Sequence, residues 1–276
     1  KAPISRFLTA NTKKDLLSAN YQIDSISIAH LLSHTSGIMD YVDDDYFNFV
    51  DSFPSHRWSR AEQIKLATTV GQPLGKSGET FRYADVNYVL LTEIIEVVTG
   101  KPFTTAVREL IDFEKNDLKS TWFVSLEEQP KPVEPLVHQY FGAQNWDSYQ
   151  IDPSWDLYGS GGLAASTKDL ALFSQALFNG KIIKDQAVFN LIYTEIPTKD
   201  SLPSQYHLGL QSSKIRAYKT YGHGGFWATI VRYIPDLDAS FSIFILDKDK
   251  KGLRTEVLAT FVKLLEEKQI DLKESY

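Results

Sequence analysis

The chain has 276 residues and contains no cysteine. This absence excludes disulfide bonds, a thiolate nucleophile and zinc sites built on cysteine. It does not restrict the compartment, because a cysteine-free chain suits the periplasm, the exterior and the cytosol equally.

Long apolar runs and clustered positive charge are also lacking. No stretch of 18 apolar residues exists, and the segment KAPISRFLTANTKK (1–14) has no apolar core of a signal peptide. The formal net charge is -6, with no basic stripe. We therefore expect no membrane span in this chain and no nucleic-acid partner. The hydrophobic content of 43% is typical of a folded chain with one or two domains.

Most of the chain predicts helices separated by loops. The expected helices share a capping serine at their start, a glycine at their end or helical apolar spacing, and they lie at 26–41 (beginning after Ser27 and ending at Gly37), 59–70, 86–100, 102–113 and 166–180. Segment 43–59 is polar and aromatic, and we expect it to be irregular. Proline and glycine predict loop or extended chain at 71–83, 127–140 and 152–163.

The last quarter of the chain predicts a different architecture. Three strands bounded by turn residues are expected at 220–227, 228–236 and 239–247, and an amphipathic helix is expected at 253–270. The fold class is therefore α/β (α+β), with an antiparallel sheet flanked by helices and an inserted, mostly helical region.

Three short motifs contain side chains that could support chemistry. Tyr83 and Asp85 precede a buried helix, and each has a structural explanation, aromatic packing and helix capping, beside a catalytic one. GHGGFW (222–227) places a histidine before two glycines whose amides could stabilise an oxyanion. His30 and His34 have the spacing of metal ligands, but position 31 is leucine where a zincin has glutamate. We expect these two histidines to form local hydrogen bonds, and we expect no metal and no cofactor.

Four segments in order resemble one family. They are ISIAHLLSHTSGI (26–38), FRYADVNYVLLTEIIEVVTGKPF (81–103), GSGGLAASTKDLALFSQALFNGK (159–181) and YGHGGFWATIVRYIPD (221–236). Together they are similar to the serine β-lactamase and penicillin-recognising superfamily. The resemblance is greatest to the branch with class C β-lactamases, D-alanyl-D-alanine carboxypeptidases and family VIII esterases.

The resemblance implies roles for seven residues. Tyr83 matches the catalytic tyrosine of the family's Tyr-x-Asn triplet, and Asp85 stands where the family has the amide-bearing asparagine. An aspartate carries charge and lacks the amide donor, so amide substrates are expected to bind differently. The remaining matches are the catalytic His223 and the substrate-binding Gly224, Gly225, Phe226 and Trp155. Gly224 replaces a threonine whose hydroxyl contacts a substrate carboxylate, and Phe226 would supply an oxyanion-hole amide.

The family's nucleophile motif, Ser-x-x-Lys, does not occur in this sequence. The resemblance places it upstream of Lys1, so we expect a preceding segment that completes the fold and the site. The expected organisation is a remnant of an N-terminal α/β region (1–25), a mostly helical region (26–205) and C-terminal strands with a closing helix (206–276).

Two functions follow from the resemblance. The first is a serine hydrolase that acts on a small-molecule or peptide substrate through an acyl-enzyme. The second is a non-catalytic, penicillin-binding-like protein that binds a ligand in the same pocket. Many family members act on cell-wall peptides, so a periplasmic or secreted location is expected, with the cytoplasm as the alternative.

Overall fold

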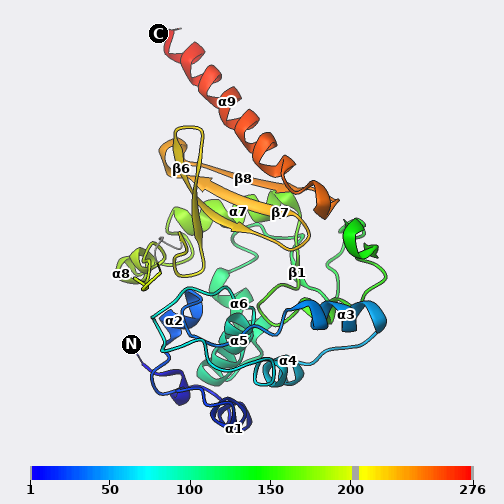
Figure 1. Cartoon of the computed structure of the whole chain (residues 1–276). Coiled ribbons are helices and arrows are strands. Elements are labelled where there is room, and N and C mark those ends of the chain that lie inside the picture. The colour runs from blue at the N-terminus through cyan, green and yellow to red at the C-terminus, as the bar shows by residue number, and fades with distance from the viewer. Residues whose placement is uncertain (1, 201–204, 275–276) are drawn as a thin grey trace.

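The computed structural model, which describes residues 2–200 and 205–274, has a helical part and a part built on an antiparallel sheet (Figure 1). The helical part comes first in the chain and consists of α1 (Ala10–Ser18), α2 (Ile28–Leu32), α3 (Asp44–Ser52), α4 (Arg60–Ala67), α5 (Val86–Thr99) and α6 (Phe103–Ile111). The later helices are α7 (Thr167–Phe178), α8 (Gln186–Leu191) and α9 (Leu253–Glu274).

The sheet is an antiparallel meander in the order β5-β6-β7-β8. Its strands are β5 (Gln211–Ile215), β6 (Tyr218–Gly224), β7 (Thr229–Ile234) and β8 (Ala239–Phe244). Two short pairs lie in the connecting region, β1 (Trp122–Phe123) with β4 (Leu163–Ala164), and β2 (Tyr140–Phe141) with β3 (Trp146–Asp147).

Helices α7 and α9 cover opposite faces of this sheet (Figure 1). Successive strand side chains point to opposite faces, so neighbouring residues of β7 meet different helices. Tyr233 stacks on Phe178 of α7 at 4.4 Å between ring centroids. Ile234 packs in a cluster with Leu258 and Val262 of α9.

Helix α5 is the centre of the helical part and contacts α2, α4 and α6. Its buried face includes Val86, Val89, Leu90 and Ile94. Gly100 ends the helix in the left-handed conformation, with φ of 68°.

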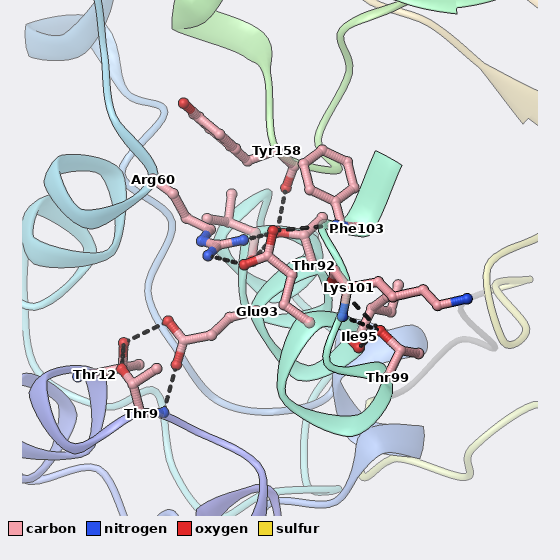
Figure 2. A network of polar contacts seen from close by, with 12 residues as sticks. Thr9, Thr12, Arg60, Thr92, Glu93, Ile95, Thr99, Lys101, Phe103 and Tyr158 are labelled. Carbon is pink, nitrogen blue, oxygen red and sulfur yellow. Dashed lines mark hydrogen bonds and ion pairs between the residues drawn. The ribbon is translucent and has the colours of Figure 1, made fainter. Parts of the chain in front are cut away.

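Two carboxylates of α5 hold distant segments against this helix (Figure 2). The buried Glu93 accepts hydrogen bonds from the Thr9 amide at 2.8 Å and the Thr12 hydroxyl at 2.7 Å, which fixes the start of α1. Glu96 pairs with Arg60 of α4 and accepts a hydrogen bond from the Phe103 amide at 3.2 Å.

Most expected helices are present, and two expectations are wrong. Segment 43–59 is not irregular, because Asp43 caps α3 by accepting from the Tyr46 amide at 2.9 Å. The helix expected over 26–41 stops at Leu32. Ser27 does cap it, but His34 has a left-handed φ of 55°, which a continuing helix excludes.

The three expected strands are present as β6, β7 and β8, and the fold class is confirmed. Strand β5 and helices α1 and α8 were not predicted. The division of the chain at residues 25 and 205 stays a prediction. Among the described residues, no helix is long and apolar enough to cross a membrane.

We predict that Glu93→Ala lowers the free energy of unfolding by about 1–3 kcal/mol, because it leaves the Thr9 amide without its acceptor. Urea denaturation measures this change. The matched control is Glu109→Ala, which removes an exposed ion pair with Lys101 and should cost less than about 1 kcal/mol. Equal losses for the two variants would contradict the anchoring role of Glu93.

Candidate active site

A cavity of about 390 Å³ lies between the helical part and the sheet. All seven residues expected at the site line it. They are Tyr83 and Asp85 from the start of α5, Trp155 from the 152–163 loop, and His223, Gly224, Gly225 and Phe226 from the end of β6 and the turn that follows. Four further lining residues were not predicted: Val42, Asp156, Ser160 and Gln211.

Asp40 fixes the backbone that carries Tyr83 and Asp85. Its carboxylate accepts a hydrogen bond from the Asp85 amide at 3.0 Å and also from the Val86 amide, so Asp40 caps the start of α5. Burial raises the pKa of Asp40 to about 6, while these amides favour its charged form. Asp85 occupies the N-cap position, but its side chain does not cap the helix. Its carboxyl group instead has a hydrogen bond with the Tyr83 side chain, and both residues line the cavity.

The buried His34 supports the same loop from behind. Its Nδ1 accepts hydrogen bonds from the Ala84 amide at 3.1 Å and the Asn87 side-chain amide at 3.3 Å. Its ring stacks on Tyr83 with 4.0 Å between centroids. Burial, followed by the proximity of His223, lowers the pKa of His34 to about 3. His34 is therefore neutral at pH 7. Its Nδ1 also lies 3.1 Å from the Ala84 carbonyl, and the tautomer with the proton on Nε2 is the one in which Nδ1 accepts from the two amides.

A chain of hydrogen bonds connects His34 to His223. His34 Nε2 lies 3.1 Å from the Tyr206 hydroxyl, which lies 3.0 Å from His223 Nε2. In the tautomer with the His34 proton on Nε2, the Tyr206 hydroxyl accepts from His34 and donates to His223 Nε2. His223 Nδ1 then donates to the Gly224 carbonyl at 2.7 Å. Burial, followed by the charge of Arg232, lowers the pKa of His223. His223 thus lines the cavity as a neutral ring with both nitrogens engaged.

The two histidines in HLLSH behave differently. His30 Nδ1 accepts from the Ser27 amide at 3.2 Å, which is the local hydrogen bond expected at the start of α2. His34 does more than hold a helix end, because it connects α5 with the sheet. Among the residues that the structure describes, no group of His, Asp or Glu is arranged to hold a metal ion.

The electrostatics of the cavity are dominated by two carboxyl groups. Burial, followed by the charges of Asp156 and Asp40, raises the pKa of Asp85 well above its usual value. Burial likewise raises the pKa of Asp156 to about 7. The pKa of Tyr83 is raised by burial and by the neighbouring Asp85 charge, so the phenol is protonated and can donate. A cation beside Tyr83 would be needed to turn it into a base.

The turn after His223 leaves the Phe226 amide free for an oxyanion. No described residue accepts a hydrogen bond from the Phe226 amide, as an oxyanion hole requires. The expectation that both glycine amides are free is wrong, because the Gly225 amide donates to the Thr229 carbonyl at 2.8 Å. A side chain at Gly225 would meet Thr229 Oγ1 at 2.2 Å, so any larger residue there would have to displace the Thr229 side chain.

Trp155 forms a wall of the cavity. It is buried and packs edge-on against Phe226 at 4.8 Å between centroids. The Trp155 carbonyl accepts a hydrogen bond from the Tyr46 hydroxyl at 2.6 Å, which holds the 152–163 loop to the helical part.

Sequence reasoning missed residues with weak local signals. Asp156 directly follows Trp155, so the expected substrate contact at Trp155 could have drawn attention to it. Tyr206 lies 17 residues before His223 in an irregular segment, and no periodicity marks it.

A helical part and an antiparallel sheet that together enclose a tyrosine and a histidine define a β-lactamase-like class of protein. The family model described as Beta-lactamase matches residues 2–259, and the chain belongs to this family.

Three relatives illustrate the match. Penicillin-binding protein 4* of Bacillus subtilis is 23% identical over 241 residues, which cover 80% of this chain and 52% of the relative. A putative D-alanyl-D-alanine carboxypeptidase of Escherichia coli is 25% identical over 239 residues, covering 75% of this chain and 54% of the relative. The chain thus spans about half the length of these curated relatives. The solved structure of D-amino acid amidase from Ochrobactrum anthropi is 20% identical with a TM-score of 0.70, covering 95% of this chain and 85% of the amidase.

We predict that Tyr206→Phe lowers the free energy of unfolding by about 1–3 kcal/mol, because the buried His34 N–H loses its acceptor. Urea denaturation measures the loss, and histidine ¹⁵N shifts report whether His34 keeps its tautomer. The control Tyr140→Phe alters a phenol that is 47% exposed and should change stability by less than about 0.5 kcal/mol. Unchanged stability of Tyr206→Phe would refute the hydrogen-bond chain.

We predict that the free energy of unfolding of Asp156→Asn, measured relative to that of the wild type, increases as the pH rises from 5 to 8. The folded pKa of Asp156 is about 7, and a free aspartate has a pKa of about 3.9. Between these values the folded state keeps a proton that the unfolded state has lost, so the free energy of unfolding of the wild type falls as the pH rises. The asparagine variant lacks this carboxyl group and escapes the loss. Denaturation at both pH values tests this, with the exposed Asp236→Asn as the control. A difference that is constant with pH would contradict the assignment.

Proposed function

We propose that the protein is a serine hydrolase that acts through an acyl-enzyme on a small-molecule or peptide substrate. The observation that carries this proposal is the convergence of Tyr83, His223 and the free Phe226 amide on one cavity. The helical part supplies the tyrosine and the sheet supplies the other two. Family membership and the neighbouring amidase and carboxypeptidase names support a hydrolytic role.

The nucleophilic serine and its lysine would come from a segment outside residues 1–276, since this sequence has no Ser-x-x-Lys. Such a lysine would supply the cation that Tyr83 needs to accept the serine proton. Tyr83 would shuttle that proton to the leaving group, and the Phe226 amide would stabilise the oxyanion. The neutral His223 would shape the cavity beside the leaving group. Because many members of the family act on cell-wall peptides, we expect this chemistry in the periplasm or outside the cell, with the cytoplasm as the alternative.

A second candidate is a non-catalytic protein that binds a ligand in the same cavity. The absence of Ser-x-x-Lys within the 276 residues favours it, as does the raised pKa of Tyr83. Ser160 is the one serine among the described residues that line the cavity, and its hydroxyl donates to the Leu157 carbonyl at 2.8 Å.

We predict that a fluorophosphonate probe adds once to the natural full-length protein, on a serine outside residues 1–276. Intact mass and peptide mapping locate the adduct. Tyr83→Phe should slow labelling by about 10²-fold or more, because it removes the proton carrier. Tyr140→Phe serves as the control and should label at the wild-type rate.

An adduct on Ser160 would overturn the placement of the nucleophile. The absence of any adduct on a folded protein would favour the binding protein instead.

A further inference from the structure

Lys248 places a positive charge behind one wall of the cavity. It lies in the short 3-10 helix η5 (Lys248–Lys250), between β8 and α9. Its Nζ lies 3.1 Å from the centroid of the Phe226 ring and 3.9 Å from that of the Phe141 ring. Such contacts are attractive, because the face of an aromatic ring carries partial negative charge. Phe226 lines the cavity, whereas Lys248 does not, so the ammonium group holds this wall from the side away from the cavity.

The two aromatic rings are the close partners of this charge. Among the described residues no carboxylate forms an ion pair with Lys248, although the charges of Asp249 in η5 and Asp156 in the 152–163 loop favour its protonated form. Burial, followed by the charge of Lys251, lowers the pKa of Lys248 to about 8. Lys248 is therefore mostly charged at pH 7 and loses its charge as the pH rises above 8.

The contact joins three segments that are far apart in the sequence. Phe141 belongs to β2, in which the Tyr140 amide donates to the Leu246 carbonyl at 2.7 Å, just before Lys248. Phe226 belongs to the turn after β6. The position of this turn is therefore coupled to β2 and η5 through the Lys248 side chain.

Phe226 depends on its side-chain contacts for the direction of its amide. Gly224 and Gly225 precede it, and glycine restricts backbone rotation less than any other residue. The Phe226 amide has no described acceptor that would hold it in place. An oxyanion-hole donor has to lie within about 2.7–3.1 Å of the oxyanion, so a small rotation of this turn would weaken it.

We propose that Lys248 is a positioning residue: its ammonium group holds the Phe226 ring and thereby directs the Phe226 amide at the oxyanion. This inference rests on the proposed function, in which that amide stabilises the oxyanion. A neutral Lys248 amine would hold the ring less well, so the alignment would weaken as the pH rises above about 8.

The test measures kcat and KM of the natural full-length protein for 4-nitrophenyl butyrate. Lys248→Met keeps a long side chain without its charge, and we expect kcat to fall by about 10-fold while KM changes by less than about 2-fold. Lys248→Arg keeps a charge that stacks on aromatic rings and should restore kcat to within about 3-fold of the wild type. The matched control Lys250→Met removes an exposed charge from the same turn and should keep the wild-type kcat. Melting temperatures confirm that the variants are folded.

The pH dependence separates the charge of Lys248 from its packing. The ratio of kcat for Lys248→Arg to kcat for the wild type should rise by about 3-fold or more between about pH 6.5 and 9.5, because only the wild type loses its charge there. Equal losses of kcat in Lys248→Met and Lys248→Arg, or a ratio that stays constant with pH, would assign Lys248 a packing role and overturn the proposal.

A spectroscopic measurement keeps the inference independent of turnover. In protein labelled with ¹⁵N-phenylalanine, the Phe226 amide signal is assigned by its loss in Phe226→Leu. This signal should shift with pH with a midpoint near 8, and the shift should be absent in Lys248→Met. The shift without any hydrolysis would support the positioning of the amide and refute the hydrolase. Hydrolysis by a protein whose Phe226 amide does not respond to Lys248 would leave the hydrolase standing and overturn the positioning role.

Discussion

The neutral imidazole of His34 is the contact on which both halves of the site depend. One ring nitrogen holds the Ala84 amide beside Tyr83, and the other reaches His223 through Tyr206. A buried chain of hydrogen bonds between uncharged side chains thereby holds the helical part and the sheet in position relative to each other. Protonation of His34 would turn Nδ1 from an acceptor of the Ala84 amide into a donor to the Ala84 carbonyl, which lies at the same 3.1 Å. The burial that keeps His34 neutral is thus also what keeps the two halves of the site aligned.

A second constraint acts on charge. Asp40 is compensated by the amides at the start of α5, whereas Asp85 has a hydrogen bond with the Tyr83 side chain, and Asp156 has one with the Ser160 side chain and feels the charge of Lys248. Burial and the charges of neighbouring carboxylates favour the protonated form of both groups, since ionised carboxylates in a low-dielectric site repel strongly. A neutral Asp85 presents both a carbonyl acceptor and an O–H donor, and so resembles the asparagine that the family has there. The protonation state of Asp85 and Asp156 therefore decides whether the site presents an amide-like group or an anion.

Local sequence signals were enough for part of this site. The Tyr83 motif could be located because a long apolar helix follows it, and the His223 motif because two glycines end a strand. The seven expected residues do lie together. The role of His34 could not be predicted, because it requires a left-handed backbone at 34 and a partner 172 residues away. Helix α3 was also missed, because its many aromatic residues obscure the helical spacing. Asp43 caps the start of this helix.

The two departures from the family pattern both make the cavity less favourable for an anionic group. Gly224 in place of threonine removes a hydroxyl donor that would contact a substrate carboxylate. Asp85 in place of asparagine adds an acid where the family has a neutral amide. Each change disfavours an anionic group at its position, and the carboxyl group of Asp156 in the same cavity adds to the effect.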